Sequence, residues 1–393
     1  MFTAPLTLTP PSQPRFTALP PLSLYIHLPW CLKKCPYCDF NSHEAREAMP
    51  EARYVAALMT DLESALPSIW GRKLSTIFFG GGTPTLLPAG HLGVVVREIT
   101  ETFGATADVE VTTEANPESV TPAYFENLRA NGFTRVSIGM QSAIPHVLRV
   151  LDRKHRPGRP EQAVAEARAA GFAHVNVDLI YGAPYETEAD WQASLDAAIA
   201  SGADHVSAYA LVVEEGTALA RQVAAGVVPP PDDDVLADRY VQADETLAAA
   251  GLKWYEVSNW ARTEADRCRH NELYWQGANW WGLGPGAHSH VGGVRWWNVK
   301  HPTRYAALAT SGRSPAAGRE LLDAAATRTE ALMLGIRMRS GLALEQLSPA
   351  GQAKGAQQVR WGLLDGAAWH RGRAVLTQRG RLLADAVVRD LMG

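Results

Sequence analysis

Short runs of β-branched and aromatic residues alternate with stretches of helical spacing between residues 22 and 251. The runs predict strands at Leu24–Leu28, Thr76–Phe79, Val109–Thr113, Arg135–Ile138, His174–Ile180 and His205–Leu211. The stretches between them predict helices such as Glu51–Leu66, Leu92–Phe103, Pro122–Asn131, Glu161–Ala170 and Ala189–Ser201. Short connections between alternating strands and helices imply an α/β fold with a parallel sheet and right-handed crossovers. This pattern alone does not separate an open doubly wound sheet from a barrel.

The pattern becomes mainly helical beyond His301. We expect helices over Thr327–Met338 and Leu344–Leu347, a hairpin around Trp369–Leu376, and a last helix over Thr377–Met392. Helices followed by a basic hairpin are typical of a winged-helix-like module. No dense Lys/Arg recognition face accompanies them, so we expect no nucleic-acid partner.

These patterns divide the chain into four parts. Residues 1–21 hold six prolines and are predicted to form a flexible leader. An α/β unit over 22–253, a connecting segment over 254–300 and a smaller C-terminal domain over 301–393 follow. The net charge is −4, but the last part alone carries 13 Lys/Arg against 7 Asp/Glu. A basic end suits an anionic partner or a membrane surface, although ordinary solvated arginine explains it more simply.

The cysteine content points to a reducing compartment. Four cysteines in 393 residues make no disulfide framework. The N-terminal residues lack the basic and apolar regions of a signal peptide, and no run reaches the about 18 apolar residues of a membrane span. We therefore expect a cytoplasmic protein.

Three of the four cysteines, Cys31, Cys35 and Cys38, fall within eight positions directly after the first predicted strand. Thiolates this close together converge on one small object. A [4Fe–4S] cube normally takes four cysteine ligands, so three would leave one iron open to a small molecule. The alternatives are a cluster of no consequence and a zinc site, for which Cys268 or a histidine such as His27 would have to fold back.

The spacing Cys-x3-Cys-x2-Cys after a strand, with Tyr25 six residues before the first cysteine and Tyr37 just before the third, resembles the radical S-adenosylmethionine (SAM) superfamily. Within it, the sequence is similar to the family of oxygen-independent coproporphyrinogen III oxidases and related heme chaperones. The resemblance implies a partial (β/α)6 barrel, an incomplete relative of the TIM barrel, with its chemistry at the C-terminal ends of the strands. It also implies a [4Fe–4S] cluster whose open iron is chelated by SAM.

Glycines and polar residues follow the later predicted strands. Gly80-Gly81-Gly82 lets the backbone approach a ligand closely, although such a turn is also a common tight corner. Glu114, Arg153 and Asp178 have ordinary alternatives as a turn cap, a surface residue and a cross-strand partner. By the resemblance, the positions that contact SAM are Tyr25, Tyr37, Gly81, Gly82, Thr83, Glu114, Gln141, Arg153 and Asp178. Some of these, Gln141, Arg153 and Asp178 among them, contact a second SAM in the decarboxylating relatives.

Seven of the twelve tryptophans lie between residues 254 and 297, around the run His270-Asn271-Glu272-Leu273-Tyr274-Trp275. Aromatic faces suit a flat macrocycle, and a neutral imidazole suits iron. On chemistry alone, an aromatic inter-domain core with satisfied histidines explains the composition more simply. By the resemblance, His-Asn-x-x-Tyr-Trp is a heme-associated motif, which assigns heme to His270, Asn271, Tyr274 and Trp275. Cys268 is a second candidate heme ligand or an inert thiol, and the glycine-rich segment ending in His288 is expected on the adenine side of SAM.

Two functions follow from the resemblance. The first is a heme chaperone that carries the cluster, SAM and heme and delivers heme to acceptor hemoproteins, at a membrane surface in one scenario. The second is an oxygen-independent coproporphyrinogen III oxidase. The oxidases carry an additional cysteine where this chain has Phe40, and a longer N-terminal segment. A third alternative, a radical SAM enzyme acting on RNA, lacks a recognisable RNA-binding domain. We therefore expect the chaperone without oxidase activity. The sequence leaves open whether SAM is cleaved and whether the protein forms a homodimer.

Overall fold

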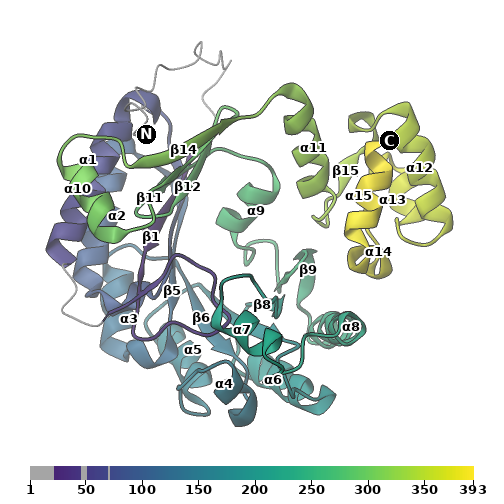
Figure 1. The fold of residues 1–393 in the computed structure, drawn as a ribbon, viewed down its shortest axis with the longest axis horizontal. Coiled ribbons are helices and arrows are strands. Elements are labelled where there is room, and N and C mark those ends of the chain that lie inside the picture. Colours follow the sequence, from purple (N-terminus) through teal and green to yellow (C-terminus); the bar gives the residue numbers. More distant parts are fainter. Residues whose placement is uncertain (1–21, 46–50, 70) are drawn as a thin grey trace.

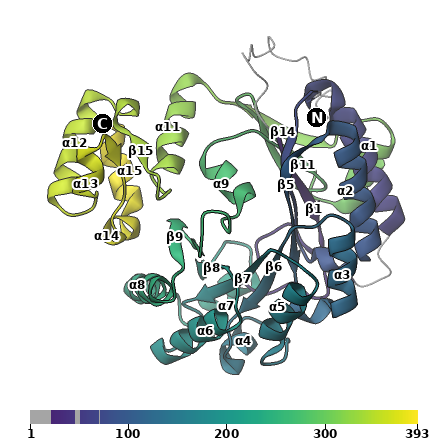
Figure 2. The same ribbon diagram turned by 180° about the vertical axis from the view of Figure 1, so that it is seen from behind.

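The computed structural model describes residues 22–45, 51–69 and 71–393 (Figure 1). The predicted leader, residues 1–21, lies outside the described residues. A helix-covered sheet curves around an open interior, and a small helical unit stands across from one edge of the sheet (Figures 1 and 2).

A row of parallel strands forms the centre of the sheet. In spatial order the row is β11 (Trp280–Leu283), β1 (Leu22–Leu28), β4 (Leu74–Gly81), β5 (Ala105–Ala115), β6 (Arg135–Gln141), β7 (His174–Tyr181) and β8 (His205–Ala210). The register places Tyr25 between Phe78 on β4 and Gly282 on β11. The six predicted strands are confirmed, although β5 is longer than predicted by six residues and β8 ends one residue earlier, and a parallel sheet follows as expected.

Helices cover the convex face of this sheet (Figure 1). They are α1 (Glu51–Ile69), α2 (Ala89–Phe103), α3 (Pro122–Ala130), α5 (Arg159–Ala169), α6 (Glu188–Ala200) and α8 (Asp233–Ala249), while the short α4 (Pro145–Val150) and α7 (Ala218–Ala224) follow β6 and β8. The main core lies between these helices and the sheet, and Leu24, Ile77 and Val177 in it are fully buried. The Thr121 side chain accepts a hydrogen bond from the Tyr124 N–H and begins α3, as its position before a proline predicts. The chain is a partial α/β barrel.

The predicted connecting segment belongs to the same sheet, at both of its edges. Beyond β8 lie the antiparallel strands β10 (Asn259–Ala261) and β9 (Lys253–Glu256). Beyond β11 lie β12 (His288–Val291), β13 (Val294–Asn298) and β14 (Ala316–Leu321). The segment between the edges forms α9 (Arg269–Trp275) inside the concave face, and α10 (Pro302–Thr310) packs on α1 (Figure 1). The four-part division of the chain remains a proposal.

A second hydrophobic core runs from Leu332 to Leu391 and belongs to the C-terminal unit. The unit contains α11 (Ala324–Gly335), the pair β15 (Leu342–Ala343) and β16 (Arg373–Ala374), and the helices α12 (Pro349–Arg360), α13 (Gly366–His370), α14 (Gln378–Leu382) and α15 (Ala384–Met392). The mainly helical character is as predicted.

Two details of the C-terminal prediction are wrong. Residues 369–376 do not form a hairpin, because Trp369 lies in α13 and β16 pairs with the distant β15. The indole of Trp369 fills the space beside Gly355, where a Cβ would come within 2.3 Å of it, and this packing favours the helix. The last predicted helix is interrupted at Leu383, whose φ of −116° and ψ of 25° are not helical.

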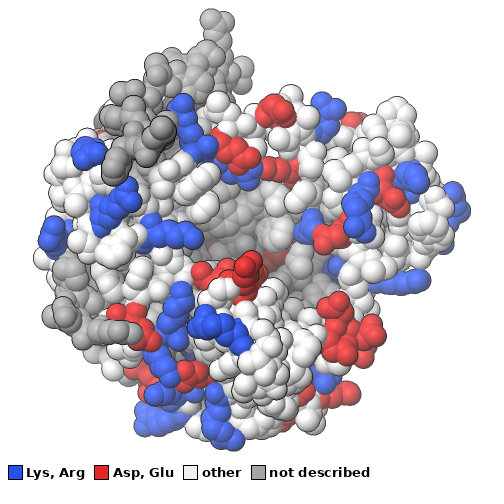
Figure 3. All heavy atoms as spheres, in the orientation of Figure 1, with Lys and Arg blue, Asp and Glu red and all other residues white. Residues whose placement is uncertain are grey.

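None of the described helices is long and apolar enough to cross a membrane. Lys and Arg are interspersed with Asp and Glu on the visible face of the C-terminal unit, so the local excess of positive charge does not gather into one patch there (Figure 3).

Candidate functional site

A cavity of about 510 Å³ lies where the parallel strands end. Its lining includes all three clustered cysteines, the glycine turn after β4 and polar side chains from the ends of β5, β6 and β7. The carboxyl ends of neighbouring parallel strands meet at one edge, which is why segments distant in sequence contribute to one site.

Backbone pairing holds the cysteine loop over this cavity. The loop continues from β1 into β2 (Trp30–Cys31), which pairs with β3 (His43–Glu44). The His43 N–H donates to the Pro29 carbonyl at 2.6 Å, and the Ala45 N–H donates to that of Cys31 at 2.8 Å. The loop therefore has a defined shape set by the protein backbone.

Each cysteine sulfur has at least one polar neighbour. The Thr83 hydroxyl donates to Cys31 Sγ at 3.7 Å, Arg153 Nη1 donates to Cys35 Sγ at 3.9 Å, and the Ser42 hydroxyl lies 3.9 Å from Cys38 Sγ. Burial raises the pKa of Cys31 and of Cys38, so these thiols stay protonated at neutral pH unless a metal holds them as thiolates.

The spacing of the sulfurs distinguishes a cluster from a single ion. Zinc ligands about 2.3 Å from the metal lie at most about 4.6 Å from one another. Among the described residues, only His174, Asp204 and Asp266 bring three potential ligand atoms within 4.8 Å of one another. At least two of the three cysteine sulfurs therefore lie farther apart than the ligands of one zinc ion. A four-iron cube binds its cysteines at separate corners, so the loop fits the larger group.

The glycine turn packs directly beneath the cysteine loop. Gly81 has a φ of +109°, and a Cβ there would lie 2.5 Å from the imidazole of His27. A Cβ on Gly82 would lie 2.4 Å from the Trp30 carbonyl oxygen. The Gly82 N–H donates to the Leu28 carbonyl at 2.7 Å, and the Thr83 N–H donates to that of Trp30 at the same distance. Glycine is required here because the cysteine loop and the glycine turn lie in backbone contact.

Two half-buried carboxyl groups lie near each other beside this turn. A Glu114 carboxyl oxygen accepts the Gly81 N–H at 3.1 Å, and burial with the nearby Asp178 raises the pKa of Glu114 to about 8. Burial also raises the pKa of Asp178, which accepts from the Ser137 hydroxyl at 2.6 Å and from the Asn176 amide at 2.8 Å. A bound cation would favour the ionised form of both groups, so the pair suits a positively charged ligand.

Gln141 and Arg153 lie on the far side of the cavity from the glycine turn. Gln141 has a φ of +65°, which is unusual for a residue with a side chain. Arg153 Nη2 donates to the Gly139 carbonyl at 2.9 Å while its other nitrogen points toward Cys35. The guanidinium therefore places a fixed positive charge between the cysteine loop and the end of β6.

Eight of the nine positions predicted for SAM line this one cavity: Tyr37, Gly81, Gly82, Thr83, Glu114, Gln141, Arg153 and Asp178. Tyr25 lies in an adjoining inner cavity of about 130 Å³, where its hydroxyl bonds to His27 Nδ1 at 3.0 Å. Sequence reasoning missed other lining residues, among them Asn116, Glu118, His155 and Tyr209. Asn116 and Glu118 follow Glu114 at the same strand end, and that position is a signal for them.

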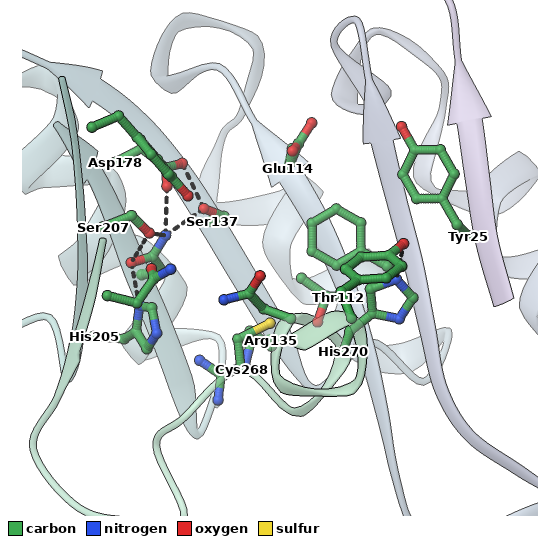
Figure 4. Close-up of a pocket in the computed structure, with 16 residues that line it drawn as sticks. Tyr25, Thr112, Glu114, Arg135, Ser137, Asp178, His205, Ser207, Cys268 and His270 are labelled. Carbon is green, nitrogen blue, oxygen red and sulfur yellow. Dashed lines mark hydrogen bonds between the residues drawn. The ribbon is translucent and has the colours of Figure 1, made fainter. Parts of the chain in front are cut away.

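The inner cavity contains a buried hydrogen-bond network (Figure 4). The Asn176 amide group donates to the hydroxyls of Ser137 and Ser207 at 2.6 and 3.0 Å, and its oxygen lies 2.6 Å from His205 Nδ1. Asp178 accepts a hydrogen bond from this network and lines both cavities. Glu114, Ser137 and Tyr209 also line both cavities. The two cavities are therefore joined through a pair of acids.

The predicted heme motif forms one wall of the inner cavity. His270, Asn271 and Tyr274 line it, whereas Trp275 is not among its lining residues. His270 is 2% exposed, its Nδ1 lies 2.7 Å from the Thr76 hydroxyl, and its Nε2 lies 2.8 Å from the Tyr274 hydroxyl. Burial lowers the pKa of His270 to about 4. Ligation of iron by His270 would first require its bond to Tyr274 to break.

Cys268 lies at the start of α9, away from the other cysteines. Its thiol donates to Glu110 at 3.6 Å, and burial raises its pKa well above the ordinary value. A buried protonated thiol of this kind is inert.

The sequence model of the Radical SAM superfamily matches residues 25–198, which span the cysteine loop and most of the parallel strands. The coproporphyrinogen III oxidase HemN from Escherichia coli has a similar structure, with a TM-score of 0.80 over 94% of this chain and 90% of that one. At 23% sequence identity this likeness shows the fold alone. Fold and cysteine motif together define the class as a radical SAM protein.

Curated relatives give a narrower result. The protein named heme chaperone HemW from Mycobacterium tuberculosis is 50% identical over 375 residues, which cover 95% of both chains. The protein of the same name from Escherichia coli is 39% identical over 70% of this chain and 71% of its own. The chain therefore belongs to the HemW family of the radical SAM superfamily.

Proposed function

We propose that the protein is a heme chaperone that carries a SAM-ligated [4Fe–4S] cluster, binds heme and passes it to acceptor hemoproteins. The observation that carries the proposal is the 50% identity, over 95% of both chains, with a protein named heme chaperone HemW. Identity of this extent includes the barrel, both sheet edges and the C-terminal unit, so it supports a common function for the whole chain.

The cavity residues supply the cofactor chemistry. Cys31, Cys35 and Cys38 would hold three irons of the cluster, and the group would supply an electron-transfer centre with one open iron. Glu114 and Asp178 suit the ammonium group of SAM, which the glycine turn leaves room to approach. The positive charge of Arg153 lies beside Cys35 and would favour an anionic thiolate cluster.

We also propose that the protein lacks coproporphyrinogen oxidase activity. Phe40 lies on the lining of the cluster cavity at the position of the oxidases' additional cysteine, and it is 58% exposed. An apolar ring there cannot replace a thiol. Cleavage of SAM, a cytoplasmic location, an acceptor at a membrane surface and a homodimer remain predictions.

The protein reconstituted with iron and sulfide under anaerobic conditions tests this function. We expect it to bind one hemin per chain, seen as a saturable change in the Soret band. Incubation with coproporphyrinogen III, SAM and dithionite should yield no protoporphyrinogen. Failure to bind hemin, or formation of that product, would overturn the proposal.

The cluster assignment has its own test in the variant Cys35→Ala. We expect it to lose the [4Fe–4S] signal in Mössbauer and optical spectra, because only two of the three thiolates remain. Cys268→Ala is the matched control, since that thiol is buried against Glu110 and lies outside the cysteine loop. A full cluster content in Cys35→Ala, or zinc in the wild-type loop, would contradict the assignment.

A further inference from the structure

Two histidines share the concave face of the extended sheet with two tryptophans. His288 and His290 are two residues apart on β12, so their side chains point to the same face. The register pairs His288 with Trp297 and His290 with Trp280, which puts both indoles on that face. Gly282, the next such position on β11, pairs with Tyr25 of the inner cavity, so this face continues the interior of the barrel (Figures 1 and 2).

His290 has the geometry of a metal-ligating imidazole. Its Nδ1 lies 3.3 Å from the Ala278 carbonyl oxygen, to which it must donate, so Nε2 carries the lone pair. Nε2 has no hydrogen-bond partner among the residues that the structure describes. Burial lowers the pKa of His290, with Arg295 lowering it further and Glu330 opposing, so the ring is neutral. His270, in contrast, has partners at both nitrogens.

Aromatic rings surround the two histidines, one of them stacked on His288 and the others meeting edge to face. Trp297 lies over Gly318 on β14, where a Cβ would come within 2.5 Å of the indole, and its ring stacks on His288 with centroids 5.8 Å apart. Trp280 contacts the ring of His290 at 5.1 Å and that of Tyr274 at 4.9 Å. Tyr274 of the motif and His290 thus contact the same indole, that of Trp280.

Charged groups of both signs lie near this surface. Lys300 is exposed after the end of β13, and burial together with Lys300 and Arg295 lowers the pKa of His288. Arg295 is itself paired with Glu330 of α11 and, at 3.4 Å, with Glu320 of β14. Lys300 is therefore the cation best placed for a carboxylate of a ligand.

We propose that heme lies on this face, with His290 as the axial ligand of its iron and the indoles of Trp280 and Trp297 against the macrocycle. The inference rests on the proposed heme-binding function and names its site. A neutral imidazole with a free Nε2 is an iron ligand, indole faces suit a flat macrocycle, and an exposed lysine suits the heme propionates. The heme-associated motif contributes through Tyr274 and Trp280, while His270 holds α9 against the barrel.

Hemin titration of the reconstituted protein and its variants tests the site. We expect His290→Ala to weaken hemin binding by about tenfold or more and to shift the Soret band, and free imidazole to restore the band. His290→Gln, which can keep a bond to the Ala278 carbonyl, should lose ligation in the same way and guards against misfolding. His370→Ala is the matched control, because the exposed His370 ring also bonds a backbone carbonyl through Nδ1, at 2.6 Å from the Gly366 oxygen.

The possible outcomes distinguish failure of the proposed heme site from failure of the proposed chaperone function. Hemin binding by the wild type, with affinity and spectrum unchanged in both His290 variants, would overturn the site and leave the chaperone proposal standing. Loss of the Soret shift in His270→Ala alone would return the ligand to the motif histidine. A wild type that binds no hemin would overturn the chaperone proposal itself.

Discussion

At the scale of single residues, the cavity contains a carboxylic acid, Glu114, whose protonated form is favoured in the folded protein. Glu114 lies where the two cavities join and accepts a backbone hydrogen bond from Gly81. Its pKa of about 8 in the folded protein lies above the ordinary value of 4.5, because the ionised form is desolvated and faces Asp178. A ligand ammonium group would remove this penalty, so cofactor binding and ionisation of Glu114 are coupled.

Removing this acid should change how stability depends on pH. Between pH 4.5 and 8 the folded state holds a proton on Glu114 that the unfolded state has lost, so stability falls as pH rises through this window. We expect Glu114→Gln to flatten that fall and to be more stable than the wild type at pH 9 by a few kcal/mol (order of magnitude). The two proteins should be closer in stability near pH 4.5. Urea unfolding of the cofactor-free protein across this range measures the difference.

Glu118→Gln is the control for this experiment. Glu118 lines the same cavity, but the backbone N–H of Arg156 lowers its pKa. Its contribution to the pH dependence of stability therefore has the opposite sign to that of Glu114. A parallel pH dependence in Glu114→Gln and the wild type would show that Glu114 ionises normally.

At the scale of elements, one buried carboxylate fixes α9 to the barrel. Glu110 on β5 accepts the N–H groups of Arg269 and His270 at 3.2 and 3.0 Å, and it pairs with Arg135 Nε at 3.1 Å. Arg135 Nη2 in turn donates to two carbonyls of the chain that leads into α9, at 2.8 and 2.9 Å. The N-terminus of the helix that carries His-Asn-x-x-Tyr-Trp is thus held by a charge pair inside the sheet.

Neutralising this carboxylate should be costly. Glu110→Gln leaves the Arg135 guanidinium, whose side chain is 1% exposed, without its counter-charge. We expect a loss of about 3–5 kcal/mol in the free energy of unfolding and a displaced α9. Chemical denaturation measures the loss, and the intrinsic fluorescence of the tryptophans around α9 reports the displacement.

The matched control is Asp108→Asn on the same strand, whose carboxylate pairs with Arg269 at the surface. We expect little change there, because exposed pairs contribute little. Equal effects of the two substitutions would contradict a special role for the buried pair.

The sequence predicted well those elements in which one spacing of apolar residues runs through the whole element. β6 and β7 begin at Arg135 and His174, as expected, because apolar residues recur at nearly every second position along both strands. The strands β11–β14 escaped prediction, since their tryptophans, histidines, glycines and charged residues carry no such pattern. The pairing of β11 with β1, more than 250 residues away, is a tertiary event that local pattern does not contain.

The same contrast applies to the site. The cysteine loop and the glycine turn were predictable because their residue types are dictated by chemistry and by backbone contact, as at Gly82. The surroundings of His270 were not, since only the folded chain shows that Thr76 and Tyr274 occupy both of its nitrogens. Which histidine presents a free nitrogen depends on partners that lie far away in sequence.

At the scale of the whole molecule, the C-terminal unit has its own core and docks on the barrel through few contacts. Arg381 of α14 donates to Asp244 Oδ1 at 3.0 Å and to the Tyr240 hydroxyl at 2.9 Å, both on α8. Its guanidinium also lies 4.3 Å from the centre of the Trp254 ring. A second contact joins the Arg339 N–H to the Tyr255 carbonyl at 2.8 Å. The opposite end of the unit approaches the sheet through the Arg295–Glu330 pair, beside the proposed heme surface.

Arg381→Ala should therefore loosen the docking without unfolding the C-terminal unit. Among the described residues, the substitution leaves the half-buried Asp244 with the Trp260 and Gln378 hydrogen bonds, at 2.9 and 3.0 Å. Loss of a partner from a buried pair is strongly destabilising, and here the interface can relieve it by opening. We expect faster amide hydrogen exchange in α8 and α14 while the core from Leu332 to Leu391 stays protected, because that core is packed within the unit.

Arg389→Ala, at an exposed arginine of α15, is the control and should leave exchange unchanged. Unchanged exchange in Arg381→Ala would mean that other contacts hold the interface, whereas loss of protection throughout residues 332–391 would mean that the unit does not fold independently of the barrel.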